Sequence, residues 1–136
     1  MITKKLFSLL LLGLMSFSLF AETPANFSED MTDFQNALDA KERVIVDFSA
    51  HWWGSCAALV KDVWNSEEFQ ALAKEKNIKL FYADIDVVDE KIIEKYKVES
   101  IPTWILIEKE TGKEEVHNGK ASLEEVLEKV NKFFVD

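Results

Sequence analysis

Two side chains with reactive chemistry, Asp47 and Cys56, lie nine positions apart in the sequence. Cys56 is the only cysteine of the 136 residues, so it cannot form a disulfide bond within the chain. A thiol is a nucleophile when it is deprotonated, and the unpaired N–H groups at the start of a helix favour the thiolate. Asp47 lies inside an apolar run, where a carboxylate is costly to bury without a partner. Cys56 is thus a buried hydrophobic residue, a free thiol or half of an intermolecular bond, and Asp47 is either a functional group or a carboxylate with a hidden partner.

The elements that position these two side chains follow from the apolar pattern. Val44 to Ser49 is mostly apolar, which predicts a central strand covered on both faces. A Gly-Ser step then leads into a helix expected to begin at Cys56. The other expected elements are a helix over 32–40 capped by Thr32, a helix restarting at Asn65, a strand over 78–84, a helix over 86–96, strands over 104–107 and 114–117, and a last helix capped by Ser122. This order predicts a three-layer α/β/α sandwich around a mixed sheet.

The first 21 residues have the pattern of a secretory signal peptide. Lys4 and Lys5 precede an apolar run that ends before Ala21, a small residue suited to cleavage. An uncleaved membrane anchor is the alternative. We expect residues 22–31 to form a polar tether and residues 32–136 to form one domain. Export would place the protein in the periplasm or outside the cell, where structural cysteines usually occur in pairs.

Charge limits the partners of the chain. The formal net charge is −9, which makes nucleic acid unlikely as a partner and disfavours an anionic membrane for the mature domain. His51 and His117 are expected to face solvent, and one cysteine with two distant histidines is no credible zinc set. We therefore expect no metal and no cofactor, and a monomer.

The segment from Val46 to Cys56 resembles the thioredoxin family signature V-D-F-x-A-x-W-C-x-x-C. It matches every fixed position except one, because Trp53 stands where the family has its first cysteine. Residues 95–103 resemble the family segment K-Y-x-V-x-x-I-P-T, whose proline is cis and corresponds to Pro102. The chain is also similar to exported thioredoxin-like proteins and to C-terminal domains of the DsbD type.

This resemblance implies a thioredoxin-like fold and a role for each matching residue. Cys56 would be the buried, resolving thiol, and Asp47 the carboxylate that assists proton transfer at it. Ile101, before the cis Pro102, would lend its backbone to an extended client peptide. Trp52 and Trp53 would belong to the same peptide-binding groove. The implied function is an exported protein that binds client or partner polypeptides, including thiol-containing ones, with dithiol activity lost or reduced to monothiol chemistry at Cys56.

Other interpretations stay open at this point. The chain would be an active thiol-disulfide oxidoreductase if position 53 were in reality a selenocysteine or a thiol, or if a partner supplied the thiol. A third hypothesis is an assembly subunit that docks through its acidic surface and Trp53. Trp53 itself either folds over Pro102 and closes the groove, or stands out as an aromatic anchor.

Overall fold

The computed structural model describes residues 22–136, so the predicted signal peptide over residues 1–21 lies outside the described part. Five strands form one mixed sheet in the order β1-β3-β2-β4-β5. They are β1 (Phe27–Ser28), β2 (Arg43–Ser49), β3 (Ile78–Asp84), β4 (Thr103–Glu108) and β5 (Lys113–Asn118). β1, β3 and β2 are parallel, whereas β4 runs antiparallel to both β2 and β5.

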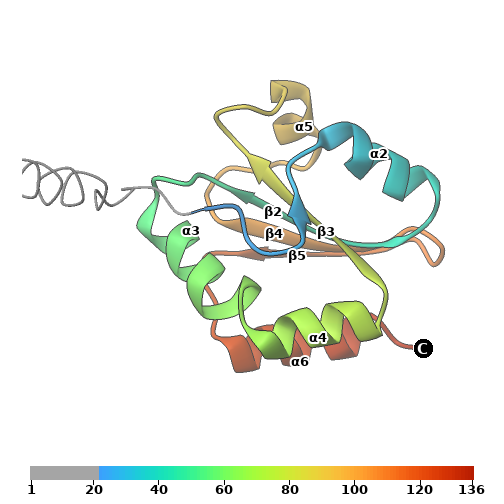
Figure 1. The fold of residues 1–136 in the computed structure, drawn as a ribbon. Coiled ribbons are helices and arrows are strands. Elements are labelled where there is room, and N and C mark those ends of the chain that lie inside the picture. The colour runs from blue at the N-terminus through green and yellow to red at the C-terminus, as the bar shows by residue number, and fades with distance from the viewer. Residues whose placement is uncertain (1–21) are drawn as a thin grey trace, which may run out of the picture.

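Helices cover both faces of this sheet (Figure 1). α2 (Met31–Asp39) and α5 (Glu90–Lys95) lie on one face, and α3 (Gly54–Leu59), α4 (Glu67–Glu75) and α6 (Leu123–Phe133) lie on the other. A five-residue π-helical segment, η1 (Val60–Trp64), continues α3. The predicted three-layer α/β/α sandwich is confirmed.

Alternation along the strands divides the core into two apolar clusters. In β2, Ile45 faces the cluster beneath η1, α4 and α6, whereas Val46 and Phe48 face the cluster beneath α2. In β3, Leu80 and Tyr82 face the first cluster, whereas Phe81 and Ala83 face the second. β2 is therefore covered on both faces, as its apolar sequence predicted.

The N-terminal segment over 22–31 is not the tether that we expected. Phe27 and Ser28 pair with Leu80 and Phe81 as the edge strand β1. The Phe27 ring is buried, with its centroid 5.4 Å from that of Trp64. A single aromatic residue in a mostly polar stretch carries no periodic signal, and its packing partners come from distant parts of the chain. The strand therefore depends on tertiary contacts that local sequence patterns do not contain.

Two of the predicted helix caps are one or two residues away from the observed ones. The Asp30 carboxylate, not Thr32, caps α2 by accepting hydrogen bonds from the backbone N–H groups of residues 32 and 33. Ser66, not Asn65, caps α4 through the N–H of Phe69. Asn65 instead accepts a hydrogen bond from the N–H of Ala25, in the segment before β1. Each of these helix starts has two nearby residues of a type that can cap a helix, so the sequence alone does not determine which of them is the N-cap.

The remaining predicted elements agree with the structure or differ from it only at their ends. β3 covers the predicted residues, and Ser122 caps α6 through the N–H of Glu125, as expected. α5 is shorter than the predicted 86–96, because Asp89 caps it and the preceding residues form turns. α3 begins at Gly54, two residues before the predicted start at Cys56. Within residues 22–136, no helix has the length and apolar character needed to span a membrane.

Candidate functional site

Cys56 lies in the first turn of α3, directly after the loop that leaves β2. Trp53 is the N-cap residue, and its carbonyl accepts a hydrogen bond from the N–H of Ala57 at 3.0 Å. The residues of α3 pack down onto the sheet, so the Cys56 side chain is fully buried as a free thiol. The helix N-terminus thus holds its cysteine in the interior and its tryptophan at the surface.

Burial governs the acidity of the Cys56 thiol. It raises the pKa of the thiol above the ordinary cysteine value, because a buried thiolate loses its hydration. Hydrogen bonding to the Ser49 side chain and the Ala50 backbone lowers the pKa, but less than burial raises it. The charge of Asp47 raises the pKa further. The helix N-terminus therefore does not produce the activated thiolate that its position alone suggested.

Asp47 lies in the middle of β2 and is fully buried, with both carboxylate oxygens hydrogen-bonded. Ser49 Oγ donates to Oδ1 at 2.6 Å, and the Trp64 indole N–H donates to Oδ2 at 2.9 Å. Burial raises the pKa of the Asp47 carboxyl to about 6, although both hydrogen bonds act to lower it. Asp47 therefore has the hidden partners that were one of the two alternatives from the sequence, and its raised pKa lies closer to neutral pH than that of an ordinary carboxyl group.

Tyr82 is a member of this site that the sequence analysis did not identify. It lies directly across from Asp47 in the register of β2 and β3. Its buried hydroxyl has no hydrogen-bond partner among the described residues. Burial raises the pKa of this phenol, and the charges of Asp47, Cys56 and Asp84 raise it further. The sequence predicted that Tyr82 lies in the strand over 78–84. Its position next to the Asp47 carboxylate follows only from the register of β2 and β3.

Trp52 and Trp53 form an exposed aromatic pair on the loop before α3. They are 52% and 46% exposed, and their rings meet edge to face with centroids 5.8 Å apart. The Trp52 indole N–H donates to Asp86 Oδ2 at 2.7 Å, which fixes its orientation. Large exposed aromatic rings of this kind are common at binding surfaces.

Ile101 and Pro102 precede β4 at the end of the sheet where β2 finishes, since Thr103 pairs with Phe48. The peptide bond between them is cis. Pro102 is buried and Ile101 partly exposed. The Pro102 carbonyl accepts a hydrogen bond from the N–H of Gly119 at 2.7 Å, which links this turn to the segment after β5. This turn therefore lies at the end of the sheet where β2 leads into the loop with Trp52 and Trp53.

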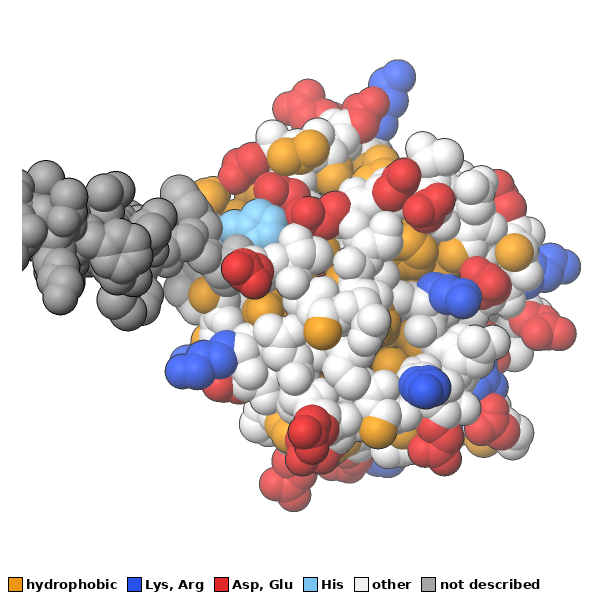
Figure 2. Space-filling view, in the orientation of Figure 1, with side chains coloured by type: hydrophobic (Ala, Val, Ile, Leu, Met, Phe, Trp, Pro, Cys, Tyr) orange, Lys and Arg blue, Asp and Glu red, His pale blue; other side chains and the backbone are white. Residues whose placement is uncertain are grey.

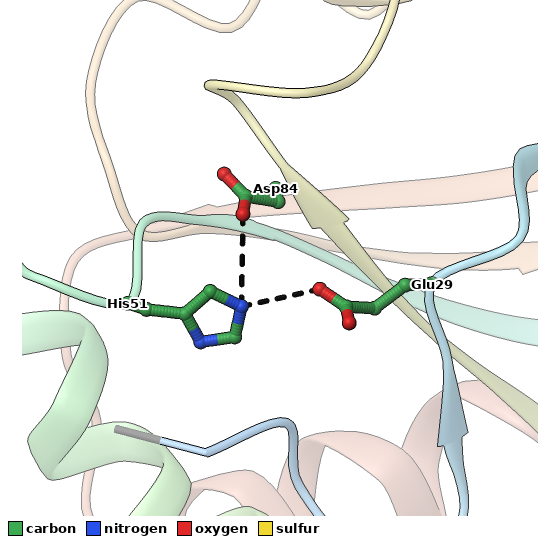
Figure 3. Close-up of side chains that lie close together, drawn as sticks. All are labelled: Glu29, His51 and Asp84. Carbon is green, nitrogen blue, oxygen red and sulfur yellow. Dashed lines mark hydrogen bonds and ion pairs between the residues drawn. The ribbon is translucent and has the colours of Figure 1, made fainter. Parts of the chain in front are cut away.

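Both histidines are only partly exposed, which is less than the sequence predicted. The His51 and His117 side chains are only 21% and 16% exposed, because their rings stack on Tyr82 and Trp104. His51 also lies between Glu29 and Asp84, and these three side chains offer ligand atoms within 4.8 Å of one another (Figure 3). This group is a possible metal-binding set that includes no cysteine.

The comparison of the chain with known sequences gives one consistent result. The profile of the family described as Thioredoxin matches residues 23–132. A thioredoxin H-type from Fagopyrum esculentum is 30% identical over 98 residues, which cover 71% of this chain and 77% of that protein. Thioredoxin-1 from Drosophila yakuba is 32% identical over 80 residues, which cover 57% of this chain and 69% of that protein.

Solved structures show the same fold. Chloroplastic thioredoxin z superposes with a TM-score of 0.63 at 21% identity, over 82% of this chain and 96% of that one. Thioredoxin from Fasciola hepatica superposes with a TM-score of 0.57 at 26% identity, over 75% of this chain and 92% of that one. The likeness confirms the predicted fold, and the family profile covers most of the described residues. The chain belongs to the thioredoxin family.

Proposed function

We propose that this chain is an exported thioredoxin-family protein that binds client or partner polypeptides and has lost dithiol exchange. One observation carries the proposal. The single thiol is fully buried with a raised pKa, while the helix N-terminus exposes Trp53 where the resemblance places the nucleophilic cysteine. Disulfide exchange needs an accessible thiolate, and neither condition holds at Cys56.

The binding surface would combine a backbone edge with an aromatic anchor. The backbone of Ile101, beside the cis Pro102, would pair with an extended segment of the client, as in β-strand addition. Trp52 and Trp53 would supply apolar contact area, because both rings are about half exposed. This exposure favours the hypothesis that Trp53 stands out as an anchor over the hypothesis that it closes the groove. The formal net charge of −9 favours a neutral or basic client segment.

Export rests on the sequence of residues 1–21, which has the charged and apolar regions of a signal peptide. Intact-mass analysis of the protein from the envelope fraction or the medium tests this part of the proposal. We expect a chain that begins at Glu22, and a full-length chain confined to the cell interior would contradict export.

Loss of dithiol exchange is tested by the dithiothreitol-dependent reduction of insulin. The wild-type chain should not accelerate the reaction above dithiothreitol alone. The Trp53→Cys variant should accelerate it, because it restores a Cys-Gly-Ser-Cys motif at the start of α3. The matched control is Trp52→Cys, which adds a thiol one residue away, outside the two-residue spacing of that motif.

Wild-type turnover comparable to that of a dithiol thioredoxin would overturn the proposal in favour of an active oxidoreductase. A mixed disulfide on Cys56 in the protein isolated from cells would support that rival as well.

The codon for residue 53 bears on the same question, because a TGG codon would exclude selenocysteine at this position. Size-exclusion chromatography of the wild type against Trp53→Ala separates binding of a transient client from a role as an assembly subunit.

A further inference from the structure

Three side chains converge where the parallel strands of the sheet end. Glu29 follows β1 directly, His51 lies two residues after β2, and Asp84 is the last residue of β3. His51 Nε2 lies 3.1 Å from Glu29 Oε1 and 3.6 Å from Asp84 Oδ2 (Figure 3). The space-filling view shows a histidine next to acidic side chains on this face of the molecule (Figure 2).

The sheet holds these three groups in place. Ser49 pairs with Asp84 in the register of β2 and β3, and the N–H of Ile85 donates to the Ser49 carbonyl at 3.0 Å. The carboxyl ends of β1, β2 and β3 therefore lie side by side at one end of the sheet. In α/β proteins, groups that bind ligands commonly gather at this end, because loops from several strands meet there.

Further contacts orient the three groups. Thr23 Oγ1 donates to Glu29 Oε2 at 2.9 Å, and the N–H of Asp86 donates to Asp84 Oδ1 at 2.9 Å. Each carboxylate is therefore held through one oxygen and directs the other at His51 Nε2. The His51 ring itself stacks on Tyr82, with centroids 4.7 Å apart and planes 22° apart. Contacts of this kind orient the ligands of metal sites in proteins.

The charge around this cluster is unbalanced. Within residues 22–136, neither Glu29 nor Asp84 forms an ion pair with a lysine or an arginine. Two carboxylate oxygens and an imidazole nitrogen face one another, and only a proton on Nε2 or a cation between them offsets their mutual repulsion. Nε2 lies within hydrogen-bond distance of Glu29 Oε1, whereas the buried Nδ1 of His51 has no hydrogen-bond partner among the described residues.

The spacing suits a small divalent cation. Zinc lies about 2.0–2.2 Å from imidazole nitrogen and carboxylate oxygen in a tetrahedral site, so that two ligand atoms are roughly 3.4 Å apart. The separations of His51 Nε2 from Glu29 Oε1 and from Asp84 Oδ2, 3.1 and 3.6 Å, lie on either side of this value, and all three ligand atoms lie within 4.8 Å of one another. An imidazole ligand favours Zn²⁺ over Mg²⁺ or Ca²⁺, which prefer oxygen ligands alone.

We propose that Glu29, His51 and Asp84 bind Zn²⁺, with the fourth coordination position open to water. Cys56 is not one of the ligands, although the His51 ring stacks on Tyr82 next to Asp47, and the site does not depend on the proposed polypeptide binding. It also changes the expectation from the sequence, which considered only the cysteine and the two histidines as ligands. Bound zinc would join the ends of three strands and offset both carboxylate charges.

Isothermal titration calorimetry of the purified, metal-free chain with zinc chloride tests the site, in a non-coordinating buffer and without a polyhistidine tag. We expect one Zn²⁺ per chain, and binding weakened about tenfold or more by Glu29→Gln and by Asp84→Asn. The matched control is Glu115→Gln. Glu115 Oε2 lies 2.9 Å from His117 Nε2, but this pair has no third ligand among the described residues. Binding should be unchanged in Glu115→Gln and also in Cys56→Ala.

A second measurement locates the metal without any substitution. Co²⁺, used in place of zinc, should broaden the imidazole proton signals of His51 in the NMR spectrum and leave those of His117 sharp. Circular dichroism shows whether each variant is folded. The proposal is overturned if the wild type binds no Zn²⁺ stoichiometrically, or if Glu29→Gln and Asp84→Asn bind as tightly as the wild type. It is overturned equally if Cys56→Ala or Glu115→Gln abolishes binding, or if Co²⁺ broadens the signals of His117 instead.

Discussion

Replacing Asp47 with asparagine should stabilise the folded chain at neutral pH, even though the substitution removes a hydrogen-bonded charge. Burial raises the pKa of this carboxyl from 3.8 to about 6. A pKa difference of about 2 units between the folded and unfolded states corresponds to about 3 kcal/mol. Above pH 6 the folded protein carries the buried carboxylate and loses this amount of stability relative to the protonated form.

The direction of the pH dependence follows from proton binding. Between pH 3.8 and about 6 the folded state retains the Asp47 proton that the unfolded state releases. The contribution of Asp47 to stability is therefore fully present below pH 3.8, and it is lost as pH rises through 6. Asparagine has no such proton. Its amide oxygen can accept from the Trp64 indole and its amide nitrogen can donate to Ser49 Oγ, so both contacts survive.

Urea unfolding of the wild type and Asp47→Asn at several pH values between 4 and 8 measures the effect. We expect the variant to be more stable by about 2–3 kcal/mol at pH 7, and the difference to shrink toward zero near pH 4. Other titrating groups cancel in this difference, because both proteins contain them. A variant less stable than the wild type at pH 7, or a difference that does not change with pH, would refute the reasoning.

Two further predictions concern burial. Cys56 should resist iodoacetamide in the folded chain and react readily in urea, because the thiol is fully buried and its pKa is raised; equal rates by mass spectrometry would contradict this. Phe27→Ala should lower the free energy of unfolding by about 3–5 kcal/mol, because the ring packs on Trp64 and Phe69. A loss below about 0.5 kcal/mol in urea unfolding would instead support the tether interpretation of residues 22–31.

The elements with strong apolar periodicity were predicted well. Residues 78–84 and the last helix carry patterns that local geometry alone explains, since alternating positions face one layer and every third or fourth position faces another. The failures lie where the local pattern is ambiguous. Asp30 and Thr32 are both good capping residues, and the sequence of the polar segment 22–31 contains nothing that reveals the strand at Phe27.

The amino-acid sequence specifies which chemical groups the protein has. It contains one thiol, a tryptophan at position 53 where the family signature has a cysteine, and an Ile-Pro-Thr segment that matches the family. These facts establish the resemblance and exclude a disulfide within the chain. They do not contain the energies of the groups, because desolvation depends on all the atoms that surround a side chain.

The tertiary structure determines how deeply each group is buried and which residues surround it. α3 packs onto the sheet and turns a thiol at a helix N-terminus into a buried one, because the loss of hydration outweighs the hydrogen bonds that favour the thiolate. Strand register places Tyr82 beside Asp47. The parallel order of β1, β3 and β2 brings one ligand atom each of Glu29, Asp84 and His51 within 4.8 Å of one another, although these residues are far apart in the sequence. Parallel strands end at a common edge, and this physical fact creates a site that no local motif contains.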